Sequence, residues 1–289
     1  MATTTTQTQQ SVNFGVNSSE PIEIPRGPVN TSLTFYAPPL DGSAPFNYVE
    51  NPPPGEPQRN YSEDAHEVTI HDIRGRESEY NFDVNGFGVL QNLPASVEKE
   101  FTDDDSIKTN YYPEIEKTLL DNVPGANRIF IFDHTVRRSH PDAPRAPVTR
   151  AHIDQTRASA ELRVKYHMGD EAETLLKSRV RLINVWRPLN GPVVASPLAY
   201  ADSQTVPDDQ IVGVQHRYPH RVGETAGVKY SPQGKWHYLS GMKNDERILL
   251  QCYDSQNGAR TPHSAFVDPR TKESWPGRES IEVRALVFG

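Results

Sequence analysis

The stretch Arg179-Val-Arg-Leu-Ile-Asn-Val-Trp, residues 179–186, alternates polar and apolar side chains. This alternation predicts a β-strand with one face in the core and the other in water. Other short runs, rich in β-branched and aromatic residues, lie between turn residues at positions 128–133, 211–216, 246–253 and 280–288. Many short strands separated by turns predict a mainly β domain, a sandwich or barrel of the jelly-roll type.

One segment departs from this β pattern. Residues 157–177 are rich in Ala and Leu and predict a helical insertion, which Gly169-Asp170 would split into two short helices. Ala158, Leu162 and Tyr166 recur at the spacing of one helical face. We therefore expect this stripe to face the core.

The N-terminal residues 1–60 predict an extended arm, partly disordered and partly docked on the core. Thr3–Thr6 is of low complexity, and the proline-rich residues 51–58 exclude a helix or a central strand. Aromatic and leucine side chains between Tyr36 and Tyr48 offer apolar surface for docking. The remaining residues, 61–289, are expected to form one β-domain.

The composition excludes several classes of protein. The 289 residues include 25 prolines, a frequency above the usual ~5%, which favours short strands and loops over a helical bundle. The single cysteine excludes an intramolecular disulfide framework and a zinc site built from several thiolates. The net charge of −8 argues against nucleic acid as the main partner. No apolar run reaches the ~18 residues of a membrane span.

The start of the chain bears on the compartment. Met1–Gln10 is rich in Thr and Gln and has neither the basic nor the apolar region of a secretory signal. We therefore expect a cytoplasmic protein.

Two His-x-Asp triplets could supply metal ligands. His140-Pro-Asp142 lies in a proline-rich loop that cannot hold a rigid pair, whereas His152-Ile-Asp154 follows an extended stretch. On a strand, residues i and i+2 project to the same face, so His152 and Asp154 would converge on one point. A second histidine from a distant strand would complete the facial triad of a non-haem Fe(II) site, which leaves open positions for substrate and oxygen.

The choice of the second histidine depends on its neighbours farther along the chain. His237 remains an alternative, but His263 is favoured because Arg278 and Ser280 come after it, at the start of the last predicted strand. An Arg-x-Ser pair on one strand face offers a guanidinium and a hydroxyl, a suitable clamp for the far end of a dicarboxylate. The pair His216 and His220 is disfavoured because the intervening proline forbids the helical turn that would align them.

Several motifs together resemble the fungal AsaB-type hydroxylase/desaturase family, whose members are also described as gibberellin desaturase-like or cephem methoxylase-related. The resemblance covers about residues 30–289, and the motifs are Asn184-Val-Trp-Arg-Pro-Leu, Lys235-Trp-His-Tyr-Leu-Ser-Gly-Met, Leu250-Gln-Cys-Tyr-Asp-Ser, Pro262-His-Ser-Ala-Phe, His152-Ile-Asp-Gln-Thr and the run from Arg278 to Phe288. It implies a double-stranded β-helix and an Fe(II)/2-oxoglutarate-dependent dioxygenase of fungal secondary metabolism, which uses Fe(II), 2-oxoglutarate and O2. His237 stands where the family has an aromatic residue, which agrees with its not being a ligand.

On this interpretation the three ligands are His152, Asp154 and His263, and the 2-oxoglutarate clamp is Arg278 with Ser280. The candidate substrate contacts are Asn184, Trp186 and Arg187. Of these, Arg187 would suit a substrate that carries a carboxylate. We expect hydroxylation or desaturation of a small molecule, with oxidative cyclisation of an amino acid (aziridine formation) as the alternative. A zinc hydrolase would not need Arg278 and Ser280, and a metal-free binding protein would not need His152 and Asp154. A small molecule is the expected partner of a monomer or homodimer.

Overall fold

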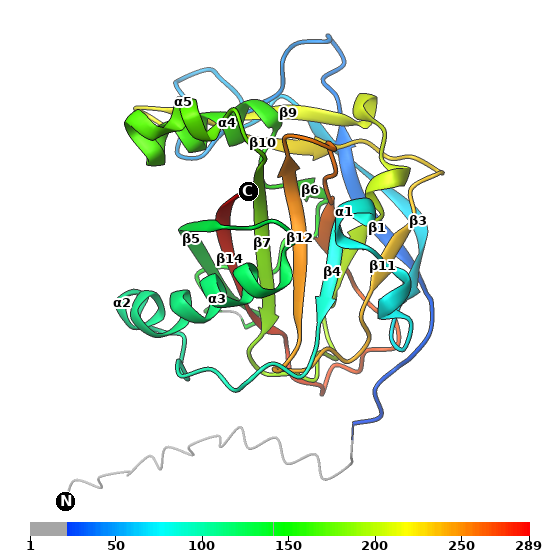
Figure 1. Cartoon of the computed structure of the whole chain (residues 1–289). Coiled ribbons are helices and arrows are strands. Elements are labelled where there is room, and N and C mark those ends of the chain that lie inside the picture. The colour runs from blue at the N-terminus through cyan, green and yellow to red at the C-terminus, as the bar shows by residue number, and fades with distance from the viewer. Residues whose placement is uncertain (1–21, 141) are drawn as a thin grey trace, which may run out of the picture.

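The computed structural model of this chain describes residues 22–140 and 142–289, so the prediction for Thr3–Thr6 lies outside the described residues. The fold is mainly β, as predicted, with two sheets that pack against each other (Figure 1). The larger sheet has the order β1 (Val29–Ala37), β3 (Ser62–Asp72), β11 (Trp236–Tyr238), β8 (Leu198–Ala201), β13 (His263–Ala265), β6 (His152–Ile153), β10 (Val222–Val228), β9 (Ile211–Arg217) and β2 (Phe46–Tyr48). The smaller has the order β4 (Phe87–Leu90), β12 (Arg247–Asp254), β7 (Val180–Pro188), β14 (Glu279–Phe288) and β5 (Arg128–Arg138).

Strand pairing is antiparallel except between β11 and β3 and between β2 and β9. The strands β1 and β2 belong to the segment predicted as an arm, and β1 pairs with β3 along its whole length. The division of the chain at residue 60 stays a prediction.

Strand β7 is buried on both faces, so the prediction of a half-exposed strand was wrong. The helix α3 (Tyr112–Asn122) covers the outer face of the smaller sheet, where Ile115 and Leu119 pack against Ile183 and Val185 (Figure 1). Polar residues of β7 are consequently inside the protein, where each polar atom without a hydrogen-bond partner costs free energy.

The predicted helical insertion is present as α4 (Arg157–Met168) and α5 (Ala172–Leu175), separated at Gly169 as expected. Its predicted buried stripe is wrong, because Leu162 and Tyr166 are 65% and 80% exposed. A second stripe with the same spacing is buried instead, made by Ala160, Val164 and Met168. The helical period was right, but the sequence holds two apolar stripes, and packing against the core selects the second.

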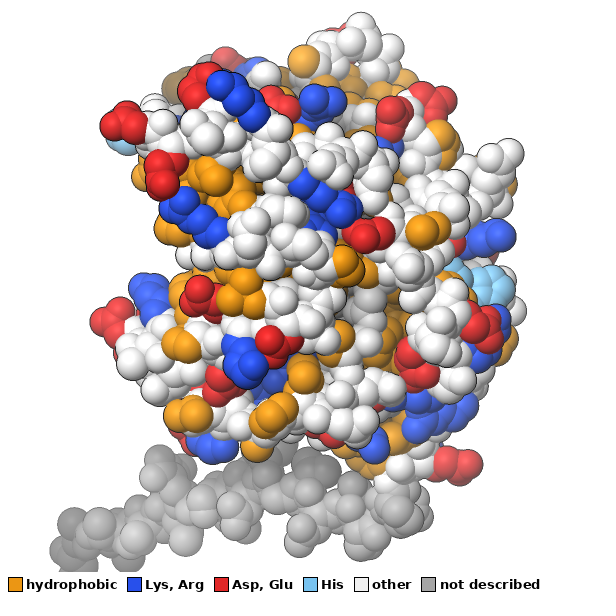
Figure 2. Space-filling view, in the orientation of Figure 1, with side chains coloured by type: hydrophobic (Ala, Val, Ile, Leu, Met, Phe, Trp, Pro, Cys, Tyr) orange, Lys and Arg blue, Asp and Glu red, His pale blue; other side chains and the backbone are white. Residues whose placement is uncertain are grey.

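The remaining helical elements are short. They include α1 (Phe82–Asn85), α2 (Asp104–Ser106), a π-helical turn (Ile107–Tyr111) that leads into α3, and 3-10 turns at Glu77–Glu79, Gly169–Glu171, Ser203–Thr205 and Asp208–Gln210. No helix in the described ranges has the length and apolar character needed to cross a membrane. On the face shown in Figure 2, acidic and basic side chains are interspersed rather than gathered by sign.

Candidate metal centre and cavity

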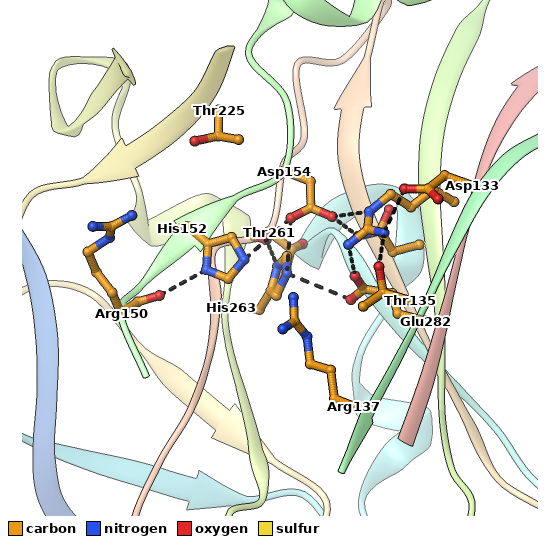
Figure 3. A network of polar contacts seen from close by, with 12 residues as sticks. Asp133, Thr135, Arg137, Arg150, His152, Asp154, Thr225, Thr261, His263 and Glu282 are labelled. Atoms are coloured by element: carbon orange, nitrogen blue, oxygen red, sulfur yellow. Dashed lines mark hydrogen bonds and ion pairs between the residues drawn. The ribbon is translucent and has the colours of Figure 1, made fainter. Parts of the chain in front are cut away.

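The sheet register brings three predicted ligands together. His152 opens β6 and His263 opens β13, and these two residues are directly paired across the two strands. Asp154 follows β6, with its Oδ1 3.3 Å from His152 Nε2 and 3.9 Å from His263 Nε2. One ligand atom from each residue lies within 4.8 Å of the other two, close enough for one metal ion (Figure 3).

Both histidines are held by backbone carbonyls on their outer side. His152 Nδ1 lies 2.8 Å from the carbonyl oxygen of Arg150, and His263 Nδ1 lies 3.2 Å from that of Thr261. A carbonyl oxygen only accepts, so each Nδ1 must carry the proton. Each Nε2 is then left with a lone pair that faces the centre, which is the arrangement of a metal-binding imidazole.

Asp154 is fixed through its other oxygen. Its Oδ2 accepts hydrogen bonds from Asn184 Nδ2 at 2.8 Å and from Arg284 Nε at 2.5 Å, so Oδ1 is the oxygen that faces the imidazoles. Burial favours the neutral acid, but the positive charge of the Arg284 guanidinium opposes it, and the pKa of Asp154 lies well below its usual range. Burial, together with the neighbouring His152, lowers the pKa of His263 and favours its neutral form.

These residues fit a divalent cation. Two nitrogen lone pairs and one carboxylate oxygen converge without a hydrogen-bond donor among them. Bringing these acceptors together costs free energy, and a bound cation removes that cost. Two histidines and one carboxylate on one side of the ion constitute the facial set of non-haem iron. Asn184, predicted as a substrate contact, donates to Asp154 and is not among the residues that line the adjoining cavity.

A cavity adjoins this centre and contains the predicted clamp. Its lining residues are Thr135, Arg137, Val148, His152, Trp186, Leu198, His263, Ser264, Ala265, Arg278, Ser280 and Glu282. Trp186, a predicted substrate contact, lines this cavity, and Arg278 and Ser280 line it together with His152 and His263.

Arg278 is buried, yet it has no acidic partner among the described residues. Its Nη1 donates to the carbonyl oxygen of Ser196 at 2.7 Å, its Nε is unpartnered, and its guanidinium carbon lies 5.3 Å from the Trp186 ring centre. Burial, and then the positive charge of Arg137, lower the pKa of Arg278 to about 9. The group is still charged at neutral pH and is available to an anion in the cavity.

Sequence reasoning missed Glu282 and Arg284. Arg284 binds Asp154, Glu282 and Asp133 and so links the ligand carboxylate to two further acids. The signal was in the last strand, where Ser280, Glu282 and Arg284 alternate with the apolar Ile281 and Val283, and Arg278 continues the same period of two. A period of two places all four on one face.

Two other residues of interest lie away from the cavity. Arg187 projects from the opposite face of β7 to Trp186, with its guanidinium 5.2 Å from the ring centre of Phe101. The structure does not bring it to the cavity. His237 is buried beside Tyr80, with ring centres 4.9 Å apart, and burial lowers its pKa to about 4. It is His263, and not His237, that meets His152 and Asp154.

Comparison with known proteins agrees with this geometry. Residues 33–288 match the family described as "Oxidoreductase/YMDC permease-like domain". The hydroxylase/desaturase poxK of Penicillium oxalicum is 35% identical, over 91% of this chain and 92% of its own. The Fe(II)/2-oxoglutarate-dependent dioxygenase nvfI of Aspergillus novofumigatus is 31% identical over 90% of this chain and 96% of its own.

A solved structure extends the likeness to three dimensions. The iron and alpha-ketoglutarate-dependent endoperoxidase NvfI superimposes with a TM-score of 0.83 at 30% identity, over 92% of this chain and 99% of that one. The predicted jelly-roll architecture is thereby confirmed.

Proposed function

This chain belongs to the fungal hydroxylase/desaturase family of Fe(II)/2-oxoglutarate-dependent oxygenases, and we propose that His152, Asp154 and His263 bind its Fe(II). One observation carries the assignment. The three inward ligand atoms lie within 4.8 Å of one another, while each outward atom is occupied by a donor or carbonyl of the protein. Such outer partners fix the orientation and basicity of metal ligands.

Arg278 and Ser280 are proposed to hold the far carboxylate of 2-oxoglutarate. Both line the same cavity as His152 and His263, and Arg278 is a buried cation that pairs with no acid of the described residues. A planar guanidinium binds a carboxylate through two parallel hydrogen bonds, to which the Ser280 hydroxyl would add a third. The apolar walls formed by Val148, Trp186 and Leu198 would keep water from the bound molecule.

The proposed reaction is hydroxylation or desaturation of a small molecule. Fe(II) with 2-oxoglutarate and O2 supplies the oxidising power that removes hydrogen from carbon. The protein contributes the orientation of the two substrates around a centre that Asn184 and Arg284 hold rigid. The alternative, ring closure of an amino acid, relied on Arg187, which packs on the other face of β7.

The test is a titration of purified protein with Fe(II) and 2-oxoglutarate without oxygen, followed by oxygen and candidate metabolites. We expect iron-dependent formation of succinate, and a product heavier by one oxygen atom or lighter by two hydrogen atoms. His263→Ala should lose metal binding, whereas His237→Ala should retain it. The reverse result for these two variants would refute the ligand assignment.

A further inference from the structure

Arg137 lies at the cavity but has no role in the site described so far. It projects from β5, and the register of the smaller sheet places it directly opposite Ser280 of β14. Residues directly opposite in an antiparallel pair share a face, so Arg137 and Ser280 reach the cavity side by side. Both line it, as does Arg278, and Figure 3 shows the Arg137 side chain reaching toward His263.

No acid in the described ranges forms an ion pair with Arg137. Its Nη1 donates to the carbonyl oxygen of Ala146 at 2.9 Å, and no carboxylate of the described residues lies within 4.0 Å of it. Burial lowers the pKa of Arg137, which means that the cation is held at a cost in free energy. An anion in the cavity would remove that cost.

The nearby acids are engaged elsewhere. Glu282 and Asp154 are both bound by Arg284, and Glu279 is paired at 2.6 Å with Arg138, the residue next to Arg137. The cavity therefore presents two guanidiniums, Arg137 and Arg278, for which the described part of the chain offers no counterion.

We propose that Arg137 binds a carboxylate group inside the cavity, next to the carboxylate bound by Arg278. The inference rests on the proposed function. If 2-oxoglutarate places its far carboxylate on Arg278 and Ser280, Arg137 is the cation left over for the second substrate. The primary substrate is then a small carboxylic acid. A carboxylate of 2-oxoglutarate itself is the other source of the same chemistry, and the test separates the two.

The experiment measures ligand binding by calorimetry on the full chain loaded with Mn(II), so that no turnover occurs. The first titrant is 2-oxoglutarate. The second titration, in saturating 2-oxoglutarate, compares acids with their neutral amides, benzoate against benzamide and hexanoate against hexanamide. The variants are Arg137→Gln and Arg137→Lys, with Arg138→Gln as the matched control on the adjacent position. If the Gln variant does not fold, the Lys variant, which keeps the charge but not the planar fork, carries the test.

We expect wild type to prefer the acids, and Arg137→Gln to reduce that preference about 10- to 100-fold while 2-oxoglutarate affinity stays within about twofold. If Arg137→Gln instead lowers 2-oxoglutarate affinity by a similar factor, Arg137 still binds a carboxylate, but that carboxylate belongs to 2-oxoglutarate. The proposal is overturned if the variant changes neither titration, including the case in which wild type shows no preference for acids. Retention of metal and 2-oxoglutarate binding by His263→Ala would separately refute the proposed function.

Discussion

The two ends of the cavity are built on opposite principles. At the metal end, every outward atom has a partner, since backbone carbonyls hold His152 and His263 while Asn184 and Arg284 hold Asp154. At the arginine end, Arg278 is buried and Arg137 is partly buried, and neither guanidinium pairs with an acid among the described residues. On the proposed function, the protein orders the three metal ligands in advance and leaves the charge of the two arginines to be neutralised by a bound anion.

This difference separates the energetics of the two ends. Removing one member of a satisfied network leaves its partners unpaired, which lowers the stability of the fold. Removing a buried cation that has no counterion also removes a desolvation cost, so the fold loses little or becomes more stable. Substitutions at the two ends should therefore differ in stability even where both abolish function.

The largest effect is expected from Asp154→Ala. This change removes a ligand and takes one of three acids from Arg284. We expect no turnover, no measurable metal binding by calorimetry, and a loss of about 1–3 kcal/mol in the free energy of unfolding by denaturant. Asp142→Ala, in the other His-x-Asp triplet, should change neither quantity. Equal losses in the two variants would contradict the assignment of the metal end.

Arg278→Met should produce a loss of function without a loss of fold. We expect 2-oxoglutarate affinity to fall by about 10- to 100-fold because a charge-assisted, two-point contact is removed. The free energy of unfolding without ligand should stay equal or rise, because a buried cation without an acid is replaced by an apolar side chain. Arg278→Lys should recover part of the affinity. A clear loss of unfolding free energy in Arg278→Met would contradict the claim that the arginine end contributes little to stability.

Asn184→Ala should have an intermediate effect on the metal end. The amide touches Asp154 and not the cavity, so this variant should weaken metal binding about 10- to 100-fold through ligand orientation. Competition with a chelator measures that affinity. The affinity for 2-oxoglutarate at saturating metal should be retained. If it fell as strongly as metal affinity, Asn184 would contact the cosubstrate after all.

The grouping of His152, Asp154 and His263 was easier to predict from the sequence than the place of Arg137. His152 and Asp154 follow from a period of two on one strand, and His263 from its order before Arg278. Arg137 could not be assigned in this way, because its place beside Ser280 depends on which strand pairs with β14. The pairing of strands that are distant in sequence cannot be predicted from local sequence patterns.

Burial was harder to predict than periodicity. The alternation in β7 correctly predicted a strand, but α3, far away in sequence, buries the face that was expected to meet water. Arg187 and Trp186 are adjacent in sequence and therefore project to opposite faces, so only Trp186 reaches the cavity. In α4, both apolar stripes have the same spacing, and only tertiary packing distinguishes them.

The smallest effect concerns His237, a buried histidine outside both ends of the cavity. Its Nε2 has no hydrogen-bond partner among the described residues, as is true of Arg278 Nε, but it is surrounded by Tyr80 and Phe87 and does not line the cavity. If the contrast between the ends is correct, an unpartnered atom signals a ligand only where a cavity adjoins it. His237→Phe should then leave metal and 2-oxoglutarate affinities unchanged at pH 7.

The same variant should reveal the cost of burying this imidazole. Burial lowers the pKa of His237 from 6.5 to about 4, so between these values the unfolded chain binds more protons than the folded one. The stability associated with the neutral imidazole is complete above about pH 6.5 and is lost as pH falls toward 4, by about 2–3 kcal/mol in all. Phenylalanine does not titrate and fills the same aromatic site. As the pH falls from 6.5 to 4, the unfolding free energy of the variant should therefore rise relative to that of wild type. Denaturant unfolding of both proteins at pH 7, 5.5 and 4.5 measures this difference, to which the other titrating groups contribute equally in both proteins. A difference that stays constant with pH would show that His237 is not buried as a neutral group.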